Sequence, residues 1–286
     1  RGSPSDTRAS PTVRSGLETV PEGDSIEHAA SLLQPLVGGV LRAVGGSHRA
    51  VAPHRRRLTG MTVAEVSAVG KHLMIHLDRG WTIRTHLGMS GSWQLYRADA
   101  TWRRSAGKAR LTLTTASHVA VCFSAPTVEV GPTSQVLDSV ADLGPDLLHD
   151  EIDTAAIIAR ARTSAAPTAA DLLLDQQVMS GIGNVYKSAL LFLEGLPPST
   201  ASEVVADADI AAMVARAQRL LRANSRPGRR TTTGQRGRGA DTWVYGRGGR
   251  ECRRCSTVIE TDTHGSLNRV SYWCPRCQPT EPPPWP

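Results

Sequence analysis

The chain has 286 residues, enough for two domains and a small additional module. Lys and Arg outnumber Asp and Glu by 33 to 26, which favours a polyanionic partner such as nucleic acid or an anionic membrane surface. No stretch approaches the roughly 20 uninterrupted apolar residues that cross a bilayer, and the first twenty residues lack the apolar centre of a signal peptide. We therefore expect a soluble, cytoplasmic protein.

Residues 1–20 are rich in Ser, Thr, Arg and Pro and show no periodicity, which predicts disorder. Order begins at Pro21. Asp24 and Glu27 have the spacing of a helix capping box, and apolar residues follow at helical spacing until Gly38 and Gly39. A helix is therefore predicted directly after Pro21.

From about residue 41 to 130 the pattern changes to short alternating segments separated by turn residues, which is typical of an antiparallel β-sandwich or barrel. Residues 73–77 and 81–85 form a credible hairpin around Asp78-Arg79-Gly80. A second strand pairing is expected between 110–114 and 118–123.

After Leu143-Gly-Pro-Asp146 the apolar period becomes helical, and helices are predicted over 151–164, 168–179, 184–194 and 203–223. A flexible, basic connector follows. The fold class is thus α+β. The expected organisation is a β-sandwich domain (21–132), a helical domain (133–223), a connector (224–250), a cysteine module (251–278) and a Pro-rich tail (279–286).

Four of the five cysteines form the pattern Cys252-x2-Cys255-x18-Cys274-x2-Cys277. Two such pairs supply four soft ligands for tetrahedral Zn²⁺, so one structural zinc is predicted, with disulfides as the alternative. Residues 258–263 and 269–273 read as the two strands of a hairpin between the pairs.

The segment Asp175–Lys187 places a Gly181-Ile-Gly183 turn between two helices. Backbone amides in such a turn, with the second helix's amino terminus, can bind a DNA phosphate. Asn184 at that terminus either contacts the phosphate or simply caps the helix.

Seven short segments occur in the order found in one known family. They are Pro-Glu-Gly (21–23), Gly-Lys-His-Leu (70–73), His-Leu-Gly-Met-Ser-Gly (86–91), Leu-Gly-Pro-Asp (143–146), Gly-Ile-Gly-Asn (181–184), Val-Tyr-Gly-Arg (244–247) and Cys-Pro-Arg-Cys-Gln (274–278). Together they resemble the formamidopyrimidine-DNA glycosylase/endonuclease VIII family, in particular a bacterial, actinobacterial-type endonuclease VIII, across residues 21–278. The resemblance implies an N-terminal β-sandwich with flanking helices, a helix-two-turns-helix domain and a C-terminal β-hairpin zinc finger.

For activity, the resemblance implies a bifunctional DNA glycosylase and abasic-site lyase of base excision repair. The secondary amine of Pro21 would attack C1′ of the damaged nucleotide, Glu22 would be the acid/base group, and Lys71 would contact the phosphate near the lesion. Without the family context, Pro21 is a rigid turn, Glu22 a charge favoured by a helix dipole, and Lys71 a solvated lysine at a strand end.

The resemblance also implies the DNA contacts. Asn184 and Arg269 match residues that grip phosphates around the flipped nucleotide, and Met89 matches a wedge that enters the space left by the extruded base. Without the family context, Met89 is only a residue that packs in an apolar loop. The expected partner is damaged DNA, double-stranded or partly single-stranded, bound by a monomer associated with the nucleoid and not with a membrane.

Catalysis through Pro21 requires a free amine, yet twenty residues precede it. We expect that Val20 marks a GTG start codon, so that the mature chain begins at Pro21. Two further departures affect the substrate: the family commonly has a Glu near Ser25 and an acidic residue near Ala189. Pro-Glu-Gly is closer to the endonuclease VIII branch, which favours oxidised pyrimidines.

Two other functions remain open from sequence alone. A blocked Pro21 would leave a non-catalytic zinc-containing protein that marks damaged or abasic DNA. A zinc-ribbon module for RNA or protein would leave the N-terminal motif unexplained.

Overall fold

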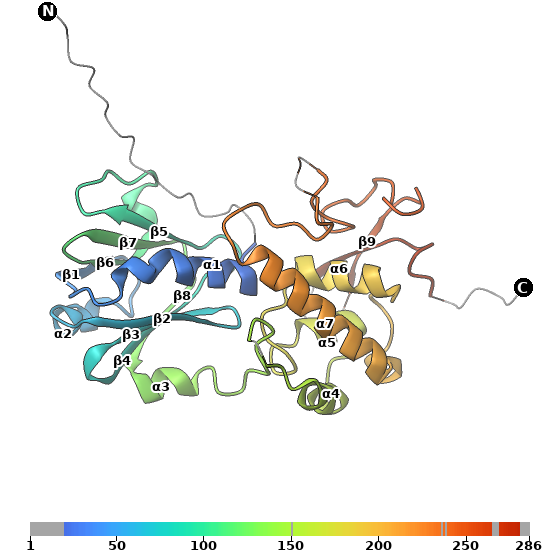
Figure 1. Cartoon of the computed structure of the whole chain (residues 1–286), viewed down its shortest axis with the longest axis horizontal. Coiled ribbons are helices and arrows are strands. Elements are labelled where there is room, and N and C mark those ends of the chain that lie inside the picture. Colours follow the sequence, from blue (N-terminus) through green and yellow to red (C-terminus); the bar gives the residue numbers. More distant parts are fainter. Residues whose placement is uncertain (1–19, 150, 236, 238, 265–268, 281–286) are drawn as a thin grey trace, which may run out of the picture.

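Two four-stranded antiparallel sheets form the first half of the chain in the computed structural model (Figure 1). The structure describes residues 20–149, 151–235, 237, 239–264 and 269–280. The expectation for residues 1–19 and the end of the tail lies outside these residues. One sheet has the order β1-β6-β7-β5, from Ala43–Gly45, Ala109–Thr114, His118–Phe123 and Ser92–Arg97. The other has the order β2-β3-β4-β8, from Val63–Val69, His72–Leu77, Trp81–His86 and Thr127–Pro132.

This arrangement confirms the predicted antiparallel β-sandwich. Both predicted pairings are present, β3 with β4 and β6 with β7. Alternate residues of each strand point inward, which is why the period of two in the sequence located these strands correctly. The short helices α2 (Arg55–Leu58) and α3 (Thr133–Asp138) lie beside the sheets.

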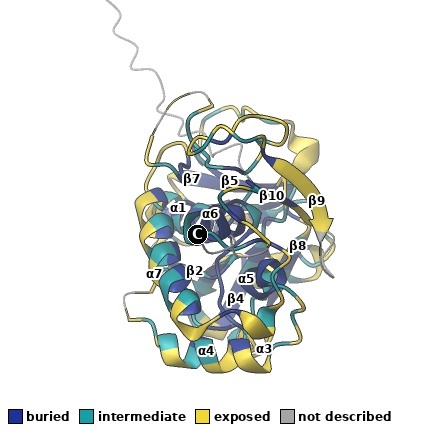
Figure 2. Ribbon diagram, turned by 90° about the vertical axis from the view of Figure 1, so that its right-hand side faces the viewer, coloured by how far each residue is buried: buried dark blue, intermediate teal, exposed yellow. Residues whose placement is uncertain are grey.

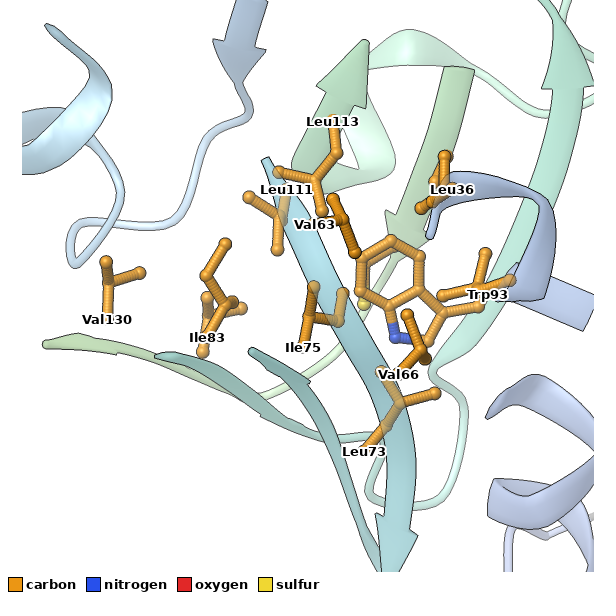
Figure 3. Close-up of a cluster of buried hydrophobic side chains, with 14 of the residues drawn as sticks. Leu36, Val63, Val66, Leu73, Ile75, Ile83, Trp93, Leu111, Leu113 and Val130 are labelled. Carbon is orange, nitrogen blue, oxygen red and sulfur yellow. The ribbon is translucent and has the colours of Figure 1, made fainter. Parts of the chain in front are cut away.

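The core of this half lies between the sheets and extends under α1 (Gly23–Leu33) (Figure 3). Trp93 of β5 is its largest buried side chain, and its indole Nε1–H donates to Thr85 Oγ1 of the opposite sheet at 3.0 Å. This bond satisfies the only polar atom of the indole ring inside the core. Ile26 and Leu33 bring α1 into the same cluster.

The capping box expected in α1 is wrong. The helix begins two residues earlier, at Gly23, with Glu22 in the N-cap position and no side-chain cap. Asp24 is therefore inside the first turn, where its carboxylate binds the Arg230 guanidinium instead of a backbone amide. The guanidinium carries a full positive charge and binds both carboxylate oxygens, whereas a backbone amide is neutral, and Arg230 is 206 residues away in sequence.

The second half is helical, with α4 (Thr154–Thr163), α5 (Ala169–Leu174), α6 (Asn184–Glu194) and α7 (Asp207–Asn224). The bounds of α6 match the prediction. Almost every residue of α6 is buried, as Figure 2 shows, because α5, α7 and β10 pack around it. None of the helices in the described part of the chain is long and apolar enough to cross a bilayer.

Helix α5 is shorter than the predicted 168–179. It ends at Leu174 because Asp175 adopts an extended conformation, and the Asp175 carboxylate accepts bonds from Ser164 Oγ and the Gln177 backbone N–H. An Asp that bonds the backbone two residues ahead favours a turn over a continued helix.

The cysteine module contains the antiparallel strands β9 (Glu260–His264) and β10 (Arg269–Trp273). An apolar cluster that includes Phe192, Val244 and Ile259 joins it to the end of α6. Among the described residues the connector contains no helix or strand, but Arg230, Thr231 and Thr232 are buried. Three consecutive buried side chains contradict the expectation that this part is freely flexible.

We predict that Leu73→Ala lowers the free energy of unfolding by about 2–5 kcal/mol, because it leaves a cavity in the core between the sheets. Leu73 is 0% exposed and lies beside Trp93 (Figure 3), so urea unfolding followed by tryptophan fluorescence measures the change. Leu137→Ala is the matched control: Leu137 is 43% exposed on α3, and its loss should cost about 1 kcal/mol or less. Equal losses for the two variants would contradict this placement of the core.

Candidate active site

Pro21 directly precedes α1 and is only partly exposed, while the next side chain, Glu22, is completely buried. The Glu22 carboxylate lies at the amino terminus of α6. It accepts backbone N–H bonds from Gly183 at 2.7 Å, Val185 at 2.7 Å and Tyr186 at 3.3 Å. The residue after a candidate nucleophile is thus anchored in the other half of the molecule.

Burial raises the pKa of Glu22 above its ordinary value, since desolvation penalises the charged form. The Arg230 and Lys71 charges and the Val185 N–H act in the opposite direction, and Asp24 adds to the increase. A carboxyl group with a raised pKa can hold a proton closer to neutral pH than an exposed Glu does, as an acid/base group requires.

The turn at Gly181-Ile182-Gly183 was expected to bind a DNA phosphate through its amides. In the structure the Gly183 N–H donates to the chain's own Glu22 carboxylate, and the Gly181 N–H donates to Gln176 Oε1 at 3.2 Å. Gly183 is needed for this approach: a Cβ there would lie 2.4 Å from Glu22 Cδ. Asn184 does not cap α6 either, since Gly183 is the N-cap and Asn184 Nδ2 donates to the Val270 carbonyl at 2.8 Å.

Lys71 lies in the turn between β2 and β3, and its charge acts on Glu22. Burial lowers the pKa of Lys71 from 10.5 to about 8, with Arg269 and Arg230 lowering it further and Glu22 opposing them. The Gly70 backbone N–H donates to Asp146 Oδ2 at 2.6 Å, which fixes this turn to the second half of the chain.

Met89 and Arg269 meet on the outside of the molecule, where Arg269 Nη1 lies 3.4 Å from Met89 Sδ. Met89 is 63% exposed, so the interpretation as core packing is wrong. Arg269 belongs to β10, whose neighbour Val270 accepts the bond from Asn184. The three residues expected to contact DNA therefore lie together, although they come from three parts of the sequence.

Two charged residues near the site were not assigned a role from the sequence. Lys187 on α6 is 1% exposed, and its Nζ donates to Ser271 Oγ of β10 at 2.9 Å. Arg230 is buried between α1 and α6. A basic connector is usually a solvated charge run, so only the long-range partner Asp24 distinguishes Arg230 from its neighbours.

The four cysteine sulfurs form one cluster within 4.8 Å of one another. Cys255 Sγ is 3.4 Å from Cys274 Sγ and 3.5 Å from Cys277 Sγ, and Cys252 Sγ is 3.9 Å from Cys277 Sγ. Tetrahedral Zn²⁺ with bonds of about 2.3 Å requires sulfurs about 3.8 Å apart. The cluster therefore fits a metal ion of this kind.

Comparison with known proteins agrees with this geometry. The family model described as the formamidopyrimidine-DNA glycosylase N-terminal domain matches residues 12–127, and that of the formamidopyrimidine-DNA glycosylase H2TH domain matches residues 143–235. The Streptomyces coelicolor protein named probable endonuclease 8 2 is 38% identical over 265 residues, which cover 91% of this chain and 94% of that protein. The Mycolicibacterium smegmatis protein named DNA-(apurinic or apyrimidinic site) lyase Nei2 is 36% identical over 260 residues, or 91% of this chain and 99% of that protein.

Among solved structures, the complex of Lactococcus lactis Fpg with DNA containing N7-benzyl-Fapy-dG has the same fold. Its TM-score is 0.77 at 22% sequence identity, covering 91% of this chain and all of that one. The fold, the order of the two domains and the similarity to full-length relatives lead to one assignment: this chain belongs to the formamidopyrimidine-DNA glycosylase/endonuclease 8 family.

Proposed function

We propose that this protein is a bifunctional DNA glycosylase and abasic-site lyase of base excision repair, with the Pro21 nitrogen as its nucleophile. The observation that carries the proposal is the position of Pro21, next to the buried Glu22 carboxylate on which the Lys71 charge acts. The names of the relatives, endonuclease 8 and DNA-(apurinic or apyrimidinic site) lyase, support the same activity. Oxidised bases, pyrimidines above all, are the proposed substrates.

In this mechanism the Pro21 amine forms a bond to C1′ of the sugar. The glycosidic bond breaks, and its electron pair leaves with the base, which takes up a proton. The amine then loses its own proton while the ring oxygen O4′ gains one, so that the sugar opens and an iminium forms. Glu22 is suited to supply that proton because burial raises its pKa. Loss of a proton from C2′ expels the 3′ phosphate, and a second elimination expels the 5′ phosphate.

The DNA contacts follow from the exposed face. Lys71 and Arg269 would bind phosphates near the flipped nucleotide. The Asn184 side chain would lie next to Arg269, because it donates to the carbonyl of the adjacent Val270. Met89, exposed and in contact with Arg269, would enter the gap that the extruded base leaves. We propose that a single monomer binds damaged DNA in this way in the bacterial cytoplasm.

One structural Zn²⁺ would be held by Cys252, Cys255, Cys274 and Cys277. The metal would fix the hairpin that carries Arg269, since a module of this size buries too little apolar surface to be stable alone. The β10 contacts with Asn184 and Lys187 then set the position of this hairpin against α6.

The test of the nucleophile compares two forms of the chain. In the full chain the Pro21 nitrogen is part of an amide with Val20, and an amide nitrogen cannot form an iminium. A polypeptide that begins at Pro21 has a free secondary amine. Borohydride treatment with abasic-site DNA should therefore trap a covalent complex, and DNA cleavage should occur, only with the shorter form.

The shorter form keeps every described helix and strand, because α1 begins after Pro21. Binding of the same DNA by both forms, measured by fluorescence anisotropy, is the control for folding. If the form that begins at Pro21 binds abasic DNA but neither cleaves it nor becomes trapped, the catalytic proposal is wrong and the protein only marks damage.

The metal is tested by replacing one proposed ligand and one cysteine outside the cluster. Cys255→Ala should reduce bound zinc, measured by elemental analysis, from one equivalent per chain to nearly none, and should weaken DNA binding by at least about tenfold. Cys122→Ala, in the core of the β-sandwich, should retain one equivalent of zinc. Full zinc content in Cys255→Ala would contradict the assigned ligands.

A further inference from the structure

Arg230 is the most highly connected charged residue next to the candidate nucleophile. It is only 4% exposed, and its Nε donates to Asp24 Oδ2 at 2.7 Å while Nη2 donates to Asp24 Oδ1 at 2.5 Å. Nη2 also donates to Ser25 Oγ at 2.7 Å. The remaining terminal nitrogen, Nη1, donates to the Val20 carbonyl at 3.0 Å. In the full chain the guanidinium therefore spans the peptide bond before Pro21 and the first turn of α1, and in a chain that begins at Pro21 its bonds to Asp24 and Ser25 remain.

These contacts place a fixed positive charge close to the Pro21 nitrogen. The Val20 carbonyl oxygen is separated from that nitrogen by about 2.2 Å of standard peptide geometry. Arg230 Nη1 is thus within about 5 Å of the atom that would attack the sugar. A guanidinium keeps its proton at any physiological pH, so this charge does not disappear when the amine is neutral.

We propose that Arg230, held by Asp24 and Ser25, is a positioning residue that keeps the Pro21 amine in its neutral, nucleophilic form. The inference rests on the proposed function, and it gives the connector a role in the chemistry. A positive charge within about 4–6 Å disfavours a second positive charge, by an amount equivalent to about 1–3 pH units. An ordinary α-amine is about half protonated near pH 8, so without such help most of the nucleophile is inactive at neutral pH.

Several other charges face the same position. Glu22 and Asp24 from α1 favour the protonated amine, whereas Lys71 from the β2–β3 turn opposes it. The Arg230 guanidinium carbon lies 5.2 Å from the centre of the Tyr186 ring on α6. Burial raises the pKa of Tyr186, so its hydroxyl is neutral. Burial raises the pKa of Tyr245 in the connector in the same way.

Arg230 decides the balance because its positive charge lies against both carboxylates. It pairs in bidentate geometry with Asp24, and its Nη1 is 3.7 Å from Glu22 Oε1. Removing the guanidinium would leave two carboxylates near the amine and would raise the pKa of the amine. Removing the Asp24 charge would leave the guanidinium uncompensated and would lower it.

The experiment uses the polypeptide that begins at Pro21 and measures the initial rate of borohydride trapping on abasic-site DNA as a function of pH. In Arg230→Gln the acid limb of the profile should move up by about 1–3 pH units, so that the rate below this limb falls by about tenfold or more and recovers at high pH. In Asp24→Asn the limb should move down. The double variant, with both charges removed, should lie close to the unsubstituted protein.

Arg230→Lys is the control for a loss of structure, because it keeps the positive charge but loses the bidentate geometry. Its rate should fall at every pH while its acid limb stays within about half a unit of the unsubstituted protein. If Arg230→Gln lowers the rate equally at all pH values, Arg230 is only structural and the inference is overturned. If Arg230→Gln does not fold, the same result for Asp24→Asn overturns it. Failure of the unsubstituted Pro21 form to be trapped at all would instead overturn the proposed function.

Discussion

The carboxylate of Glu22 at the amino terminus of α6 is the interaction on which the arrangement of the site depends. A buried carboxylate is costly unless donors replace its water, and here three backbone N–H groups at a helix terminus do so. The two segments are also bonded in the opposite direction, because the Gly23 N–H donates to the Gly181 carbonyl at 2.8 Å. Pro21, one residue away, is therefore held by α6 as much as by its own helix.

The rest of the DNA-facing surface is assembled by a few polar contacts of the same kind. The hydrogen bond from the Gly70 N–H to Asp146 fixes the turn that contains Lys71. The hydrogen bond from Lys187 Nζ to Ser271 Oγ fixes the strand that contains Arg269. Burial lowers the pKa of Lys187 from 10.5 to about 8, although Asp171 and Glu22 oppose the change. The cations that would meet phosphate are thus positioned by neighbours that remain inside the protein.

Local periodicity predicted several of the elements but not the contacts between them. Alternation located the β3–β4 hairpin, and the glycines around 181–183 located the start of α6, because both signals lie within a few residues. The capping box at Asp24 was wrong, and the Gly183 N–H has a partner other than the expected phosphate, for a common reason. Their partners, Arg230 and Glu22, lie 206 and 161 residues away and carry a full charge, so they displace the local donor or ligand that a short sequence window suggests. The site residues Met89, Asn184 and Arg269 were found through their resemblance to family motifs, and no periodicity would have placed them side by side.

The buried charges around Pro21 make the best sense as a consequence of chemistry. Glu22, Asp24 and Arg230 are all nearly inaccessible to water, and replacing buried ion pairs by apolar side chains is often neutral or stabilising. A fold selected for stability alone has no need of three charges in one place between α1 and α6. An amine that must stay neutral beside two carboxylates does need a fixed positive charge that solvent cannot screen, since the same guanidinium at the surface would have little effect on it. The connector therefore contributes through the buried Arg230 and not through its overall basic character.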